Sequence, residues 1–332
     1  MCVIGWGMIN LRVVMMTLAA ALAASGWTAG AEVQPGAGEL QRVCEERAGA
    51  LDARVGIAVL MNGEAAPAVA VGASELYPMM SVVKLPLAVV VMQGVADGRW
   101  RLDQRFELDA RDLKEDTWSP LREAFPQGGA FTLRVLLDYM VAQSDNNVCD
   151  YLFELVGGPP VVEAEMQRWL DGEVMRIRYD EEGLRDVAKL SGNSASPMAL
   201  CRLLQALHDA AARSPREEEA EGRGKSRHIL PPELAEVLLD VMAGTRTGAS
   251  CLAAGLPEGC RLEHKTGSGP TLPDGRISAR NDVGIIRLPG GGYACVAVFV
   301  ADAAADAAAM DGVMSYVAAA VVQALRAESA AP

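Results

Sequence analysis

Ser81 and Lys84 are the first residues whose types and spacing suggest chemistry, and they open an apolar run from Leu85 to Val95. The run is compatible with a helix, in which positions i and i+3 place both side chains on one face. A serine hydroxyl needs a neighbouring base before it can attack, and a lysine in a partly dry pocket can have its pKa lowered enough to act as that base. Backbone N–H groups at a helix N-terminus could also stabilise an oxyanion. Alone, the pair is equally compatible with a helix-capping serine and a solvated lysine.

Two further polar motifs follow along the chain, Ser144-Asp145-Asn146 and Lys265-Thr266-Gly267. Each motif alone is typical of a turn or a strand end, but the ordered triple is the signature of class A β-lactamases and penicillin-binding proteins. From about residue 45 to 326 the sequence resembles a class A serine β-lactamase. The segments closest to the cephalosporinase-like, extended-spectrum branch are Tyr77-Pro-Met, Thr117-Trp-Ser-Pro, Ser144-Asp-Asn-Asn-Val-Cys-Asp, His264-Lys-Thr-Gly and Asn281-Asp-Val-Gly.

The resemblance implies a catalytic role for several of these residues. Ser81 would attack the lactam carbonyl, and its proton would go to Lys84 or, through a water molecule, to Glu181, because the identity of the acylation base is disputed. Ser144 would carry a proton between Lys84 and the departing lactam nitrogen, a task that suits a short hydroxyl. Asp145 precedes a predicted helix and is expected to accept backbone N–H bonds that hold its loop.

The resemblance also implies a set of substrate-binding residues: Asn146, Lys265, Thr266, Gly267, Ser268 and Trp118. Asn146 would bond an acylamino group, and Lys265 at a strand end would meet the carboxylate that β-lactams carry. Thr266 and Ser268 would add hydroxyl donors, and Gly267 would let a ligand approach the backbone closely. The backbone N–H groups of Ser81 and Ser268 would form the oxyanion hole. Trp118 would lie at the cleft rim or pack against the helical part, and Arg246 could assist with the carboxylate.

Release of an acyl group requires a base and a water molecule, and the candidate bases are Asp180, Glu181 and Glu182. Taken alone, an acidic run is more typical of a solvated surface. The surrounding segment, however, resembles the omega loop of the family. With Leu184 on the family's apolar position, the catalytic glutamate is Glu181, which lies 181 − 146 = 35 residues after Asn146; Glu182 is the alternative.

Two positions depart from the family pattern. Arg185 stands where an asparagine commonly helps to hold the water, and an arginine there could bond Glu181 and lower its pKa, which would weaken Glu181 as a base. Met80, rather than a cysteine, precedes Ser81. The disulfide of carbapenem-hydrolysing members is therefore not expected.

The elements that would position these groups predict an α+β fold. A hairpin is expected around Asn62-Gly63, between runs 55–61 and 64–72, and further strands at 260–264, 281–288 and 293–301. Helices are expected at 39–53, 85–95, 133–141, 148–156, 161–170, 197–212, 232–242 and 306–326. Residues 32–75 and 231–332 would form a discontinuous domain, an antiparallel sheet flanked by helices. Residues 76–230 would form an all-helical domain that contains the omega-like loop, residues 171–194.

The composition limits the classes of partner. The chain has 332 residues, of which 51% are hydrophobic, and a net charge of −13, so it can build a sizeable core but is poorly suited to nucleic acid or an anionic membrane. The 3 histidines and the cysteines show no metal-ligand spacing. We expect neither a metal nor a cofactor, and we expect a monomer.

Residues 1–31 are typical of a signal peptide. An apolar run from Val13 to Trp27 follows Arg12 and precedes a small-residue cleavage site near Ala31. The run is shorter than the roughly 20 residues that span a bilayer. Met1 and Met8 are both candidate starts. The sequence therefore predicts an exported, periplasmic or secreted protein without stable membrane insertion.

The mature chain would keep six cysteines in an oxidising compartment. Cys251 and Cys260 are close enough in sequence to pair across a loop, but reduced, buried thiols are an equal alternative.

The predicted function is hydrolysis of the β-lactam amide bond through a serine acyl-enzyme, with cephalosporins among the substrates, which would confer β-lactam resistance. The alternatives are a penicillin-binding DD-peptidase and a non-hydrolysing β-lactam-binding protein. The acidic omega-like loop favours the hydrolase, whereas Arg185 is the feature that favours a binder without turnover.

Overall fold

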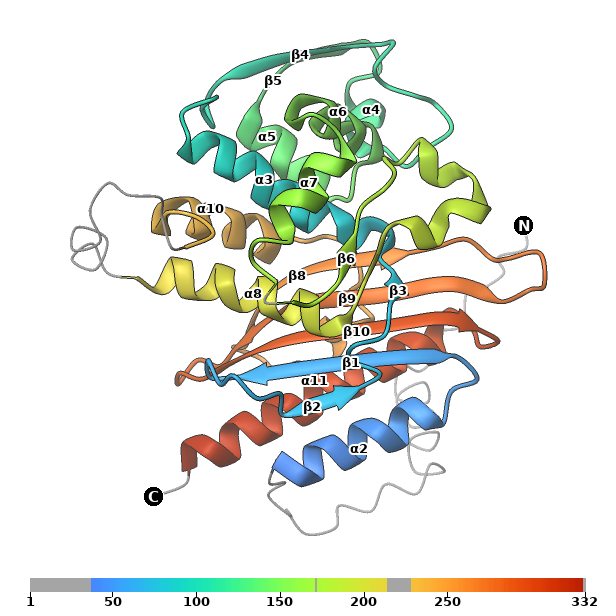
Figure 1. The fold of residues 1–332 in the computed structure, drawn as a ribbon, viewed down its shortest axis with the longest axis vertical. Coiled ribbons are helices and arrows are strands. Elements are labelled where there is room, and N and C mark those ends of the chain that lie inside the picture. Colours follow the sequence, from blue (N-terminus) through green and yellow to red (C-terminus); the bar gives the residue numbers. More distant parts are fainter. Residues whose placement is uncertain (1–36, 171, 214–227, 331–332) are drawn as a thin grey trace, which may run out of the picture. The chain divides into compact units, whose positions relative to one another are not determined.

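A five-stranded antiparallel sheet is the centre of the computed structural model, which describes residues 37–170, 172–213 and 228–330 (Figure 1). In order across the sheet the strands are β2 (Val69–Val71), β1 (Arg54–Met61), β10 (Tyr293–Ala303), β9 (Ile277–Arg287) and β8 (Arg261–Ser268). The predicted Asn62-Gly63 turn follows β1, and both of its residues have the positive φ that a tight hairpin turn requires. The predicted signal peptide lies outside the described residues.

Both faces of the sheet are apolar, because successive strand side chains point in opposite directions. In β10, Val296 and Val298 belong to one core, and Ala297 and Phe299 belong to the other. Helices α2 (Ala37–Gly49) and α11 (Ala307–Ala330) cover the first face, and α8 (Pro197–Ala212) and α10 (Pro232–Ala243) lie against the second (Figure 1). The sheet is therefore buried on both sides.

The remaining helices lie beyond the face that α8 and α10 cover (Figure 1). They are α3 (Lys84–Ala96), α4 (Pro120–Ala124), α5 (Leu133–Leu137), the π-helical turn η2 (Asp138–Ala142), α6 (Asn146–Val156) and α7 (Pro159–Met166). Thr132 and Ser196 cap α5 and α8 by accepting backbone N–H bonds of 3.3 and 3.1 Å from Val135 and Ala199. The predicted α+β architecture is confirmed. The sequence boundaries of its two domains stay a prediction.

Five short strands were missed by the sequence patterns. Strands β4 (Arg105–Asp109) and β5 (Gly128–Thr132) form an antiparallel hairpin where the sequence patterns predict no strand. Mostly solvent-accessible strands lack the clear apolar alternation on which such predictions depend. Strands β3 (Tyr77–Pro78), β6 (Met175–Arg176) and β7 (Ser194–Ala195) form a small separate sheet.

Helix α11 is long and apolar enough to span a bilayer by composition alone. Its apolar residues are instead buried on the sheet, where Met314, Val317 and Val321 pack beside β10 and the other strands. We therefore interpret α11 as a core helix.

Candidate active site

Ser81 lies in one turn of 3₁₀ helix, η1 (Met80–Val83), that leads directly into α3. The predicted position of Ser81 at a helix N-terminus is confirmed. Met80, the residue before Ser81, has a φ of 49°, a conformation that costs energy for a side chain of this size. The segment must therefore be held in place by its neighbours.

Strands β8 and β9 hold this segment. Asn281 on β9 donates hydrogen bonds of 2.8 and 3.1 Å to the carbonyl oxygens of Pro78 and Met79. On β8, a Cβ added to Gly267 would lie 2.5 Å from the Met79 carbonyl oxygen. A glycine is therefore needed here for close approach of the chain's own backbone, and its role in ligand binding stays a prediction.

Lys84 is the centre of the polar cluster. It is completely buried, and its ammonium donates hydrogen bonds of 2.7 Å both to Ser81 Oγ and to Asn146 Oδ1, and a third to Glu181 Oε1. Three acceptors satisfy all three N–H donors of a lysine ammonium. The structure therefore brings together four predicted site residues from three separate parts of the chain.

The pKa of Lys84 shifts in the direction opposite to the one expected from burial. Burial lowers this pKa, but the negative charge of Glu181 and its hydrogen bond, with smaller contributions from Cys149 and Asp145, outweigh burial and raise it overall. The expected lowering of the pKa is wrong for the resting protein. Lys84 is therefore a charged donor that faces the Glu181 carboxylate.

Among the three candidate acids, the structure places Glu181 at Lys84. Its side chain is 13% exposed, and its backbone N–H donates a 2.7 Å hydrogen bond to Asp150 Oδ1 on α6. Asp180 accepts a bond from the Gly183 N–H, and Glu182 pairs with Lys114 at 2.9 Å. The two flanking carboxylates thus have other partners.

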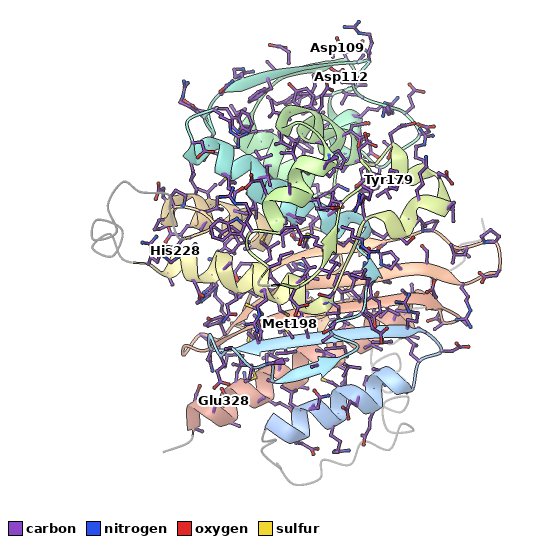
Figure 2. The ribbon with its side chains drawn as sticks, in the orientation of Figure 1. Asp109, Asp112, Tyr179, Met198, His228 and Glu328 are labelled. Carbon is purple, nitrogen blue, oxygen red and sulfur yellow. The ribbon has the colours of Figure 1, made fainter. Side chains whose placement is uncertain are left out.

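Asn193 closes the neck of the omega-like loop. Its side chain is fully buried, accepts the backbone N–H groups of Arg178 and Tyr179 at 2.8 and 3.0 Å, and donates to the Tyr179 carbonyl at 2.7 Å. The backbone carbonyl of Asn193 accepts a hydrogen bond from the Met79 N–H at 2.8 Å. Tyr179 lies where the loop meets the sheet side of the molecule (Figure 2). One amide side chain therefore fixes the loop next to the Ser81 segment.

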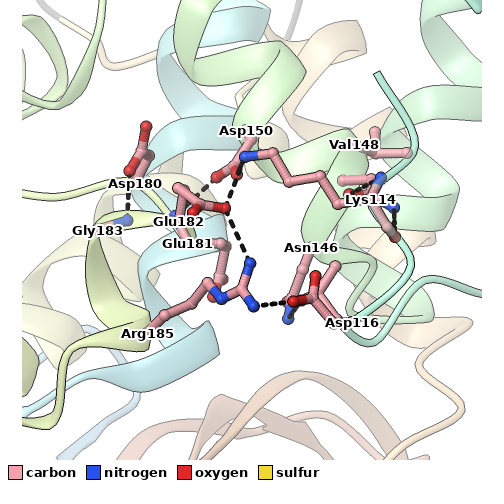
Figure 3. A network of polar contacts seen from close by, with 12 residues as sticks. Lys114, Asp116, Asn146, Val148, Asp150, Asp180, Glu181, Glu182, Gly183 and Arg185 are labelled. Atoms are coloured by element: carbon pink, nitrogen blue, oxygen red, sulfur yellow. Dashed lines mark hydrogen bonds and ion pairs between the residues drawn. The ribbon is translucent and has the colours of Figure 1, made fainter. Parts of the chain in front are cut away.

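Arg185 pairs with carboxylates other than Glu181, contrary to one expectation from the sequence. Its guanidinium instead pairs with Asp116 and, at 3.3 Å, with Glu182 (Figure 3). Arg185 therefore does not compete with Lys84 for the Glu181 carboxylate.

Asp145 has the structural role expected of it. Its buried carboxylate accepts bonds from the Leu121 and Val148 N–H groups at 2.8 and 2.9 Å and from the Ser119 hydroxyl. Burial is the largest influence on its pKa and raises it, whereas these hydrogen bonds and Lys84 oppose that rise. Asp145 thereby fixes the start of α6, where Asn146 meets Lys84.

Ser144 and Lys265 form a second polar pair. Ser144 has a φ of 62°, and its hydroxyl accepts a 3.0 Å hydrogen bond from Lys265 Nζ, which also donates to the Thr266 carbonyl at 2.8 Å. Burial, and then the charge of Lys84, lowers the pKa of Lys265 to about 7. Lys265 is completely buried and lies behind Ser144. The predicted contact of Lys265 with a substrate carboxylate stays a prediction.

A cavity of about 370 Å³ opens over these groups. The residues that line it are Ser81, Trp118, Ser144, Asn146, Thr247, Gly248, Cys251, Thr266, Ser268, Arg280 and Asn281. Trp118 is 55% exposed at the rim, and its indole N–H donates to the Gln143 carbonyl at 2.9 Å. Four of the six predicted binding residues thus line one hollow, and Lys265 and Gly267 are not among its lining residues.

Sequence reasoning did not assign five residues of this wall to the site: Thr247, Gly248, Cys251, Arg280 and Asn281. Arg280 carries the positive charge among the lining residues, and Asp311 holds its guanidinium with an Nη2–Oδ2 bond of 2.7 Å. Arg246, the suggested helper, does not line the cavity. Asn281 stands in a motif already noted for the family, whereas no local pattern distinguishes Arg280.

All six cysteines among the described residues are free thiols. The pairing of Cys251 with Cys260 that was one of two alternatives is therefore not observed. Cys251 instead donates a weak bond to Asp311 Oδ1 at 3.3 Å.

Comparisons with known proteins agree with this geometry. Residues 37–325 match the family model described as "Beta-lactamase enzyme family". The chain is 30% identical to β-lactamase VEB-1 of Pseudomonas aeruginosa over 76% of this chain and 79% of that protein. It is 32% identical to the extended-spectrum β-lactamase PER-1 of the same species over 80% of each.

Solved structures give the same result. A β-lactamase from Chitinophaga pinensis is 33% identical, with a TM-score of 0.75 over 88% of this chain and 99% of that one. The TLA-1 extended-spectrum β-lactamase is 29% identical, with a TM-score of 0.77 over 86% and 98%. The chain therefore belongs to the β-lactamase enzyme family, as a class A serine β-lactamase related to the VEB, PER and TLA enzymes.

Proposed function

We propose that this enzyme opens β-lactams by acyl transfer to Ser81 and that Glu181 activates the water that frees the acyl group. The observation that carries the proposal is the set of three bonds from Lys84 to Ser81, Asn146 and Glu181. Nucleophile, charged donor and base are thereby within direct reach of one another. No metal or cofactor is required for such chemistry.

In acylation, Ser81 Oγ forms a bond to the lactam carbonyl carbon and loses its proton toward Glu181, directly through Lys84 or through a water molecule. The raised pKa of Lys84 supports Glu181 as the final acceptor. The C–N bond then breaks, and Ser144 protonates the leaving nitrogen. The bond from Lys265 to Ser144 supports this step, because Lys265 can return a proton to that hydroxyl. The proton that Glu181 took from Ser81 then replaces the one given up by Lys265, so Glu181 is ionised again before deacylation.

In deacylation, Glu181 takes a proton from water, and the resulting hydroxide attacks the ester carbonyl. The bond between Ser81 Oγ and the acyl carbon breaks, and Ser81 regains a proton. Backbone N–H groups of Ser81 and Ser268 are proposed to stabilise the oxyanion in both steps. The inward position of Glu181 supports this role.

Substrate binding is proposed to use the cavity wall. Asn146 would bond the acylamino group, Trp118 would cover the rim, and Thr266 and Ser268 would donate to the substrate carboxylate. The positive charge of Lys265, which is buried next to Ser144, would attract the same carboxylate. PER-1 and TLA-1 are named as extended-spectrum enzymes, and this likeness supports cephalosporins among the substrates and a role in resistance.

Mass spectrometry of acylated variants tests the proposal. In Glu181→Gln the covalent adduct should form and persist, because an amide cannot accept the proton of water. Acylation should remain measurable, since loss of the Glu181 charge lowers the pKa of Lys84 and frees it as an alternative base. Ser81→Ala should form no adduct. Rapid release of the adduct from the glutamine variant would place the base elsewhere.

We also infer that the enzyme acts outside the cytoplasm after removal of residues 1–31. This inference is supported by the sequence pattern of residues 1–31 and by the family, whose members act on substrates that arrive from outside the cell. N-terminal sequencing of the exported protein would test the predicted cleavage near Ala31.

A further inference from the structure

We propose that five alternating charges form an ion-pair clamp that keeps Glu181 in its catalytic position, and that this clamp makes deacylation sensitive to ionic strength. In order, its members are Asp150, Lys114, Glu182, Arg185 and Asp116 (Figure 3). The proposal rests on Glu181 as the deacylating base. It assigns positioning roles to residues that do not touch the reacting atoms.

The clamp joins three parts of the fold. Asp150 belongs to α6, Lys114 and Asp116 belong to the loop that precedes α4, and Glu182 and Arg185 belong to the omega-like loop. Lys114 Nζ lies 3.3 Å from Asp150 Oδ2 and 2.9 Å from Glu182 Oε2. Arg185 then joins Glu182, at 3.3 Å, to Asp116. Each interior member thus has one partner of opposite charge on either side.

Two members act directly on the peptide that carries the base. Asp150 uses one carboxylate oxygen for Lys114 and the other for the Glu181 N–H, at 2.7 Å. Glu182 follows Glu181 in the chain and is held from the other side by Lys114 and Arg185. The backbone of Glu181 is therefore fixed before its side chain reaches Lys84.

The clamp also reaches the substrate-binding side of the cavity. Asp116 is followed by Thr117, whose hydroxyl accepts a 2.8 Å bond from the Asn146 side chain, and by Trp118, whose carbonyl accepts the Asn146 N–H at 2.9 Å. Asn146 in turn bonds Lys84. The loop before α4 is thus bonded both to Asn146 and, through Arg185, to the segment that carries the base.

The partly exposed positions of these side chains set the size of the effect. An isolated surface pair contributes little, but charges that form a network contribute more than separate pairs. Salt weakens such contacts, because the Debye length falls from about 30 Å at 0.01 M to about 3 Å at 1 M ionic strength. We therefore expect modest rate effects that disappear at high salt.

The test measures the first-order deacylation rate of a preformed acyl-enzyme, which removes the salt dependence of substrate binding. For the wild type, the rate should fall about two- to fivefold between about 0.01 M and about 1 M salt. Arg185→Gln and Asp116→Asn should each be slower at low salt and should respond less to salt than the wild type, because only the pairs of Lys114 with Asp150 and Glu182 remain. The double variant should be no slower than Arg185→Gln alone, because Asp116→Asn removes only the pair with Arg185, which that variant has already lost.

Two controls separate positioning from general stability. Arg185→Lys keeps the charge and should restore most of the rate. Arg101→Gln breaks an exposed pair with Asp103 at 2.9 Å, outside the clamp, and should leave both the rate and its salt response unchanged. Acylation should slow less than deacylation in every variant, because Lys84 can serve as an alternative base for Ser81, whereas the deacylating water depends on Glu181.

A salt-independent wild-type rate would overturn the clamp without any variant. So would wild-type deacylation rates in Arg185→Gln and Asp116→Asn at low salt, or additive losses in the double variant. A wild type that acylates without turnover would refute the proposed function itself, together with the clamp. Normal turnover with unaffected variants would refute the clamp alone.

Discussion

Asp150 shows how a residue can help the chemistry while opposing folding. Burial, followed by the nearby charge of Asp180, raises the pKa of Asp150 to about 6, although Lys114 and the Glu181 N–H oppose this rise. The folded protein therefore binds this proton more tightly than the unfolded chain does. An ionised Asp150 costs stability above about pH 6, and that cost disappears as pH falls toward the ordinary aspartate range.

Asp150→Asn should therefore stabilise the protein at pH 7, by up to about 3 kcal/mol in the free energy of unfolding. The gain should shrink as pH falls from about 6 to about 4, because wild-type Asp150 becomes protonated and resembles the amide. Chemical unfolding of both proteins at several pH values measures this difference. A variant that is less stable at pH 7, by an amount independent of pH, would contradict the assignment.

At the scale of single residues, the sequence identified the site residues better than it predicted their electrostatic environment. Ser81, Lys84, Asn146 and Glu181 were singled out, and the structure brings them together. The direction of the Lys84 pKa was wrong, because it depends on the carboxylate of Glu181 from a distant segment. The partner of Arg185 was missed for the same reason, since long-range charge pairs leave no local pattern.

Among the elements, the omega-like loop depends on the hydrogen bonds that the Asn193 side chain makes across its neck. Asn193→Ala would leave the N–H groups of Arg178 and Tyr179 without their acceptor, at a cost of about 1–3 kcal/mol for a buried polar group. Because the loop carries Glu181 but not Ser81, deacylation should slow more than acylation. Burst and steady-state kinetics separate the two steps.

The acylation rate of this variant serves as an internal control. Equal losses of rate in both steps would mean that Asn193 supports the Ser81 segment as much as the loop, through the bond from the Met79 N–H to the Asn193 backbone carbonyl.

Long, periodic elements could be predicted from the sequence, whereas short ones could not. Helix α8 was expected at residues 197–212 and is found there, because Ser196 and Pro197 mark its start. Strands β3, β6 and β7 have two residues each, too few for any period to appear. They are nevertheless the elements that join the omega-like loop to the Ser81 segment, so the site's scaffold was less predictable than its side chains.

Across the whole molecule, thiol chemistry offers a test of packing. Five of the six described cysteines are buried, and Cys260 is partly accessible. Burial raises the pKa of the Cys44 thiol to about 12 and that of Cys149 well above its ordinary value.

A thiol reagent should therefore modify Cys260 rapidly in the native mature protein and the other described cysteines only after unfolding. A reducing agent should leave the melting temperature unchanged. A drop in melting temperature on reduction would reveal a disulfide and contradict the free thiols of the structure.

Helix α3 carries Lys84 at its first position and is buried along nearly its whole length. Such a helix tolerates few substitutions, since any change of volume disturbs close packing on every side. The rim is different, because Trp118 is largely exposed and Arg280 on β9 lines the open hollow. Under antibiotic selection, substitutions that broaden the range of β-lactams hydrolysed should accumulate at such rim positions. The sequence of helix α3, which carries the Lys84 ammonium, should change least.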